Sequence, residues 1–151
     1  MPTLEIKSLY DDDVYHEIID RLNKINADSK PIWGKMGASQ MLAHCAEVQA
    51  VMSGKPLQKI PWYMKMFSVY IKKMITNRKP YKKNLPTAPD YIIADERDFD
   101  KEKARFTAAL EKFRAQQLNP PDHPLFGKLT EHERGWGMYK HVDHHLRQFG
   151  A

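Results

Sequence analysis

Residues 130–150 have the sequence TEHERGWGMYKHVDHHLRQFG, and this stretch decides the fold that we expect. Thr130 and Glu133 have the spacing of a capping box, in which the two side chains accept hydrogen bonds from backbone N–H groups at the start of a helix. The apolar residues that follow recur at helical spacing and form one arc: Met138, Tyr139, Val142, Leu146 and Phe149. The stretch therefore predicts an amphipathic helix that begins after Thr130.

Two histidines of this helix are candidate metal ligands. His141 and His145 are four residues apart, so their imidazoles lie one above the other on a single helix face. A third candidate, His44, belongs to a predicted helix over residues 39–52, where it flanks the apolar stripe of Met41, Cys45, Val48 and Met52. Because all three flank a stripe that must be buried, they are expected to meet at a seam between helices. The pattern predicts a three-histidine metal site, and the alternatives are a solvated helix edge for the His141 and His145 pair and a hydrogen-bonded core position for His44.

Helical spacing of apolar residues recurs in two further segments, residues 11–26 and 98–117. Together with the two helices above, they predict an all-α fold, a four-helix bundle that forms one domain over residues 1–151. A chain of 151 residues that is 42% hydrophobic is long enough to bury a core of its own. Between the second and third long helices, residues 62–76 favour a short amphipathic helix and residues 80–89 an extended loop.

The composition excludes several classes of protein. The sequence has no apolar run of about 18 residues and no charged-then-apolar leader, which predicts a cytoplasmic protein. The only cysteine, Cys45, excludes an internal disulfide and is expected to be a small core residue. No Ser-His-Asp order, glycine-rich phosphate loop or pair of cysteines competes with the histidine site. The net charge of +5 permits an acidic partner without requiring one.

Four segments, residues 33–36, 40–45, 123–130 and 139–150, together resemble the DinB/YfiT-like superfamily, and within it the branch called domain of unknown function 1569. The resemblance implies a four-helix bundle with a divalent metal held by one histidine of the second helix and two of the last, here His44, His141 and His145. Characterised relatives include mycothiol-dependent maleylpyruvate isomerase and bacillithiol transferases, and many members are dimers. A homodimer and a low-molecular-weight thiol are therefore implied, whereas this branch has no established reaction.

Three imidazole ligands leave at least one coordination position open, which is typical of a catalytic rather than a structural metal site. Zinc is the metal we expect first, with nickel, manganese or iron admissible, because imidazoles discriminate poorly among these ions. A coordinated water or thiol would become a nucleophile near neutral pH. The function we expect is that of a metal-dependent hydrolase or a thiol-dependent transferase acting on a small molecule.

Five further residues are candidates for supporting roles at this site. Glu47, one turn after His44, is a candidate general base or hydrogen-bond partner of a ligand, although a solvated carboxylate is equally compatible with its position. Gln148, one turn beyond His145, is placed to orient a ligand or a water. His144 is expected beside the site, with replacement of His145 as the ligand as the alternative. Trp33 and Trp136 are candidate walls of a pocket, with core packing as the plainer interpretation.

The basic segment, residues 55–83, has nine lysines and arginines and no acidic residue. Its aromatic residues are Trp62, Tyr63, Phe67, Tyr70 and Tyr81. One hypothesis is that the protein is a non-catalytic binding module that docks this segment on an anionic membrane or on nucleic acid. The alternatives are an ordinary solvated insertion, or a lid or dimer contact of the metalloenzyme, and between docking and a lid we expect the lid or dimer contact.

Overall fold

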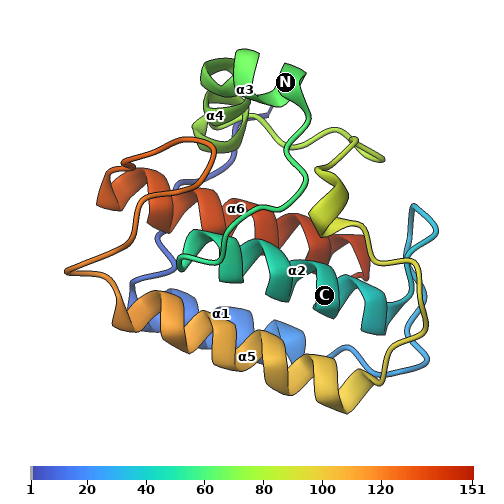
Figure 1. The fold of residues 1–151 in the computed structure, drawn as a ribbon. Helices are drawn as coiled ribbons and strands as arrows, with labels where there is room; N and C mark the ends of the chain where they lie inside the picture. Colours follow the sequence, from blue (N-terminus) through green and yellow to red (C-terminus); the bar gives the residue numbers. More distant parts are fainter. Residues whose placement is uncertain (1) are drawn as a thin grey trace.

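The computed structural model describes residues 2–151, and over that range the chain is helical and contains no β-strand. Figure 1 shows the helices in chain order: α1 Asp12–Leu22, α2 Ala38–Met52, α3 Trp62–Met66, α4 Ser68–Thr76, the 3₁₀ turn η1 Pro89–Tyr91, α5 Phe99–Ala115 and α6 Glu131–Gln148. The all-α prediction is confirmed. No helix within residues 2–151 has both the length and the apolar character needed to cross a membrane.

The four longest helices lie alongside one another, with α2 between α5 and α6 (Figure 1). Helix α2 packs against α5 and α6, and α6 also packs against α1 and α4. In this view α3 and α4 sit above α6, on the side away from α1 and α5 (Figure 1). The basic segment therefore forms a cover over one side of the α2–α6 pair.

Helix α2 is buried around most of its circumference, so the predicted narrow apolar stripe is wrong. Leu42, Ala43 and Ala46 lie outside that stripe and are as completely buried as Met41 and Cys45. The reason is the central position of α2, which has neighbours on several sides and therefore needs small or apolar residues on several faces. Cys45 is a buried core residue with a free thiol, as expected.

The predicted helix boundaries hold best where a local signal marks them. At the start of α6, Thr130 Oγ1 accepts from the Glu133 N–H and Glu133 Oε1 accepts from the Thr130 N–H, both at 3.0 Å, which confirms the capping box. Helix α1 ends at Leu22 rather than Asn26, because the chain continues in tighter turns, with the Ile25 N–H donating to the Leu22 carbonyl. Ile25 nevertheless stays in the core.

The single helix predicted over residues 62–76 is wrong, because α3 and α4 are separate and the chain bends at Phe67 (φ −98°, ψ 16°). The end of α4 is held on α6. The buried indole of Trp136 donates to the carbonyls of Thr76 and Asn77, and Lys140 Nζ donates to the Met74 carbonyl. These bonds satisfy the carbonyl groups that the end of a helix leaves without partners, and they fix the cover in place.

Candidate metal centre

Three histidines from two helices meet at the seam between α2 and α6. His44 comes from the middle of α2, and His141 and His145 come from successive turns of α6. One ring nitrogen from each of the three lies within 4.8 Å of the others, and the Nε2 atoms of His44 and His141 are 3.1 Å apart. The structure thus brings together the three residues that the sequence selects as ligands.

The outer nitrogen of the His44 ring is fixed by the backbone. His44 Nδ1 lies 2.8 Å from the carbonyl oxygen of Tyr91, in η1. A carbonyl oxygen can only accept a hydrogen bond, so Nδ1 carries the ring proton and Nε2 presents its lone pair towards His141. Histidines that bind metals are usually held in this way, with the second ring nitrogen donating to a carbonyl or carboxylate.

The His145 ring is held in the same manner by Gln148. His145 Nδ1 lies 2.8 Å from Gln148 Oε1, and Gln148 Nε2 donates at 3.0 Å to the carbonyl of Trp33. The second bond fixes which end of the amide faces His145, because only its NH₂ group can donate to a carbonyl. Nδ1 of His145 therefore carries the proton, and its Nε2 is free to act as a ligand.

The site favours neutral imidazoles, the form in which histidine binds a metal. Burial lowers the pKa of His44, and burial together with the charge of neighbouring histidines lowers the pKa of His141 far below its ordinary value. Burial and the charge of His44 bring the pKa of His145 to about 3, against the opposing effect of the Gln148 hydrogen bond. The three rings are therefore uncharged at neutral pH.

The donor set fits a transition-metal ion such as Zn²⁺. Two nitrogens bound tetrahedrally to zinc at about 2.1 Å are about 3.4 Å apart, so a pair at the 4.8 Å limit would have to close by about 1.4 Å, or about 0.7 Å for each ring. Each ring can make such a movement by a small rotation within its rotamer. The fit rests on three neutral nitrogen donors. In His44 and His145 the ring proton is held on Nδ1, away from the position between the three rings that a metal ion would occupy.

His144 lies beside the three histidines and lines the same cavity. Its ring centroid is 5.2 Å from that of His145 and 5.5 Å from those of Trp33 and Tyr81. Burial lowers the pKa of His144, partly offset by the charge of Asp143. His144 is therefore a neutral imidazole within reach of a molecule bound at the site, and the metal-ligand geometry selects His145 rather than His144.

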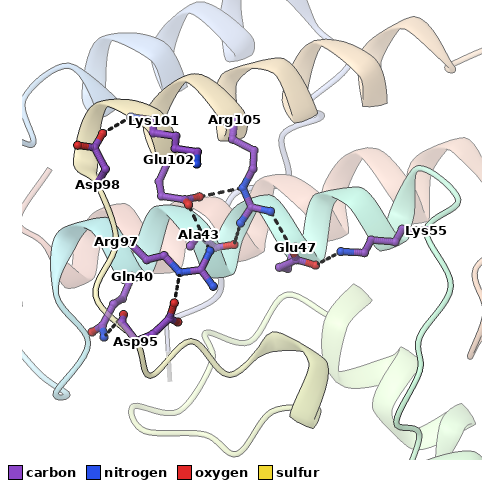
Figure 2. Close-up of polar contacts among 10 residues, drawn as sticks. All are labelled: Gln40, Ala43, Glu47, Lys55, Asp95, Arg97, Asp98, Lys101, Glu102 and Arg105. Carbon is purple, nitrogen blue, oxygen red and sulfur yellow. Dashed lines mark hydrogen bonds and ion pairs between the residues drawn. The ribbon is translucent and has the colours of Figure 1, made fainter.

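Glu47 is not brought together with the histidines. Its two carboxylate oxygens pair with Lys55 Nζ at 2.6 Å and Arg105 Nη1 at 2.7 Å, in the network between α2 and α5 drawn in Figure 2. Burial alone would raise the pKa of Glu47, but its bonds to Lys55 and Arg105 outweigh burial and lower it. Both oxygens are occupied and the residue does not line the cavity, so its geometry is that of an ion pair between helices.

The two candidate wall tryptophans lie in different surroundings. Trp33 lines the cavity beside His144, with Lys83 Nζ 4.7 Å from its ring centroid. Trp136 is 1% exposed, belongs to the core and does not line the cavity. Trp136 is therefore a core residue, and its indole N–H donates to the carbonyls of Thr76 and Asn77 at the end of α4.

A cavity of about 600 Å³ opens onto the histidines and runs beneath α3 and α4. Its volume lies within the range of sites that hold a small organic molecule. Apolar side chains form most of its wall, and its polar side chains include those of His44, His141 and His145 together with Gln40, Asn84 and Gln148. A concave apolar site with a few convergent polar groups is the usual form of a ligand pocket.

Sequence reasoning missed two residues of this site. Tyr91 orients His44 through its backbone carbonyl, which carries no signature in the sequence. His123 lines the cavity, and its Nδ1 accepts from the N–H groups of Leu125 and Phe126 at 3.0 and 3.3 Å. The short pairing of His123 with Gly127 positions it, and the His-Pro-Leu-Phe-Gly run was the available signal.

Comparison with known proteins identifies a family of unknown function. The model of the family described as "Protein of unknown function (DUF1569)" matches residues 3–151. No curated protein and no solved structure gives a match. The resemblance to the 1569 branch is therefore confirmed over nearly the whole chain.

Proposed function

The chain belongs to the DUF1569 family, and from that premise we propose that it is a divalent-metal-binding protein of the DinB/YfiT-like four-helix-bundle type. His44, His141 and His145 are the proposed ligands. The observation that carries the proposal is the convergence of three neutral imidazoles, with the Nδ1 protons of His44 and His145 held away from the shared point by Tyr91 and Gln148. Zinc is the first choice of metal, and nickel, manganese or iron fit the same ligands.

The reaction class that fits this site best is metal-dependent hydrolysis or thiol transfer. A divalent ion bound there would act as a Lewis acid with an open position for water or a thiol. His144 is the neutral imidazole beside the ligands, and we assign to it the transfer of a proton to or from the reacting group. No carboxylate lines the cavity within residues 2–151, so the role considered for Glu47 passes to an imidazole.

The decisive experiment measures turnover of an activated ester, and of an electrophile in the presence of a thiol, by protein dialysed against zinc. We expect activity that a chelator removes and added zinc restores, and a His144→Gln variant that keeps its metal but loses about 10²-fold in rate. Turnover that is insensitive to the chelator would contradict the enzyme proposal. The proposal includes a homodimer and a location in the cytoplasm.

The outer surface of α3 and α4 favours a second candidate function, docking on an anionic membrane. Trp62, Val69 and Tyr70 are 72%, 81% and 70% exposed, and Lys65 and Lys73 lie among them. Exposed aromatic residues beside lysines are typical of helices that lie at a membrane interface. Sedimentation with phosphatidylserine vesicles tests this function, and binding that persists when single-stranded nucleic acid is the polyanion would indicate a general polyanion surface instead.

A further inference from the structure

The cavity changes from polar to apolar along its length. On α2 the residues that line it are Gln40, His44, Val48 and Met52, four residues apart and therefore on one face. On α6 the order is the reverse, since Gln148 at the end of α6 bonds to Trp33 just before α2, and Met138 precedes the histidines. The polar end of the cavity thus holds His44, His141 and His145, and the wall towards Met52 and Met138 is mostly apolar. His123, from the segment that joins α5 to α6, also lines the cavity, and its Nδ1 is already bonded to two backbone N–H groups.

Helices α3 and α4 contribute only apolar side chains to the cavity, Met64 from α3 and Ile71, Met74 and Ile75 from α4, and the rest of the cover adds Leu57 and Tyr81. Lys35 is the one charged side chain in the wall within residues 2–151, and no Asp or Glu lines it. A polar molecule placed beneath α3 and α4 would lose hydrogen bonds to water and would find no side-chain partner on these two helices. The wall therefore favours a hydrocarbon chain, with an anionic group at the histidine end.

We propose that the cavity binds a straight-chain amphiphile, with a carboxylate-type head at the histidine site and a hydrocarbon tail along α2 towards Met52. From His44 to Met52 the helix rises about 12 Å. Since each carbon of an extended chain advances by roughly 1.3 Å, that length holds roughly nine or ten carbons. Five methionines in the wall, Met36, Met52, Met64, Met74 and Met138, allow the wall to adapt to the shape of a chain.

The placement of the head rests on the proposed metal site, whereas the placement of the tail does not. Burial of the tail depends only on the apolar wall, so a metal-free protein should still bind a long chain. A carboxylate head, in contrast, would gain from a bound divalent ion and from Lys35. The head and the tail can therefore be tested separately.

The test is calorimetric titration of zinc-loaded and metal-free protein with straight-chain carboxylates from butanoate to dodecanoate. We expect affinity to rise about fourfold with each added methylene, up to about ten carbons, and then to level off. Zinc should strengthen the binding of decanoate and leave that of decanol unchanged. Affinity that does not depend on chain length, in protein whose zinc content is confirmed, would overturn the inference and leave the metal proposal intact.

Two valine-to-phenylalanine variants test the path of the tail, one inside the cavity and one outside it as the matched control. Val48 lines the cavity between His44 and Met52, whereas Val69 is 81% exposed on α4. Val48→Phe should shorten the chain length at which affinity levels off by about two carbons, and Val69→Phe should not change it. An unchanged chain-length profile in a folded Val48→Phe protein would overturn the proposed path of the tail. If chain-length dependence appears in a protein that binds no zinc, the inference about the tail stands and the proposed function fails.

Discussion

The Nε2 atoms of His44 and His141 lie 3.1 Å apart, although the two residues are separated by 97 positions in the chain. Two ring nitrogens at this distance either share one proton or share one cation. His44 holds its own ring proton on Nδ1, against the Tyr91 carbonyl, so its Nε2 is an acceptor. The lone pair of His44 Nε2 thus faces the ring of His141, and the predictions about metal binding test this arrangement.

The first prediction concerns the ligands. His44→Ala, His141→Ala and His145→Ala should each abolish binding of about one divalent ion per chain, because two imidazoles hold a metal much less tightly than three. His144→Ala should have a milder effect. The measurement is elemental analysis after dialysis against zinc, with the exposed His132→Ala on the same helix as control. Full occupancy in the His141→Ala, His145→Ala double variant would disprove the assignment.

The second prediction concerns Gln148, which holds the Nδ1 proton of His145. Gln148→Leu should weaken zinc binding by about 10–100-fold, because the ring loses the partner that fixes its tautomer and orientation. Competition with a chromogenic chelator measures the change. Gln117→Leu, which alters a glutamine bonded to Glu131 away from the cavity, is the control. Equal affinities in the two variants would show that Gln148 does not position the ligand.

The third prediction is that the helices survive removal of the metal. The core that joins α1, α2, α5 and α6 is apolar and does not include the three histidines. A chelator should therefore lower the melting temperature without loss of helical circular dichroism at room temperature. At a zinc concentration of 100 times Kd the stabilisation is about 2.7 kcal/mol. The His141→Ala, His145→Ala protein should show no shift with zinc, and unfolding of the wild type on chelation would make the site structural.

The fourth prediction is a pH dependence that comes from His123. Burial lowers the pKa of His123 from 6.5 to about 4. As the pH falls from about 6.5 to 4, the unfolded chain gains a proton there that the folded chain does not, so the free energy of unfolding falls, by about 3 kcal/mol in total. Urea unfolding of metal-free protein at pH 7 and pH 4.5 measures this loss.

His123→Gln provides the comparison for that experiment, because its amide oxygen can replace Nδ1 as an acceptor for the N–H groups of Leu125 and Phe126. The variant should be less stable than the wild type at pH 7, and the difference should shrink at pH 4.5. The other buried histidines contribute equally to both proteins. A difference that is the same at both pH values would show that His123 does not carry the effect.

The fifth prediction concerns the lysines of the basic segment. We expect a quadruple variant to keep its metal content but to differ in turnover or association state. The four changes are Lys72→Gln, Lys73→Gln, Lys82→Gln and Lys83→Gln. Lys72 pairs with Glu133 of α6 at 3.1 Å, and Lys83 lies over the Trp33 ring. The changes therefore loosen the contact of the cover with α6 and with the wall of the cavity, while the ligands are untouched.

Dividing the four changes into two pairs separates the hypotheses. If the segment covers the site, Lys72→Gln with Lys83→Gln should change turnover, and Lys73→Gln with Lys82→Gln, both exposed, should not. If it docks on membranes, the two pairs should weaken vesicle binding to a similar degree, and binding should fall steeply with added salt. Sub-micromolar, salt-sensitive vesicle binding that the quadruple variant loses would favour docking.

The features that the sequence predicted well depend on local signals. The Thr130–Glu133 capping box places the start of α6, and the four-residue spacing places His141 and His145 on one face. The meeting of His44 with them was predicted from its place beside the apolar residues of α2, and it holds although α2 is buried on several faces rather than along one stripe. Such signals lie within one or two turns of helix, where the periodicity of the backbone determines neighbours.

The features that the sequence did not predict depend on contacts between distant segments. Arg105 forms an ion pair with Glu47 although it lies 58 positions further along the chain, and no pattern in the sequence of α2 predicts this pair. The hydrogen bond between His44 and the Tyr91 carbonyl could not be predicted either, because any residue at position 91 has the same backbone oxygen. No proline or glycine in the sequence predicts the bend at Phe67. With this bend, apolar side chains of both α3 and α4 line the same cavity.

The separation of His44 from His141 also orders events during synthesis of the chain. While α6 is still within the ribosome, His44 is the only one of the three proposed ligands that has emerged, and a single imidazole binds a metal weakly. The full site arises only when α6 has emerged and has packed against α2. Binding of the ion would therefore follow the packing of α6 on α2 rather than start the folding of the chain. A truncated chain that ends before His141 would lack two of the three proposed ligands and would bind no metal at this site.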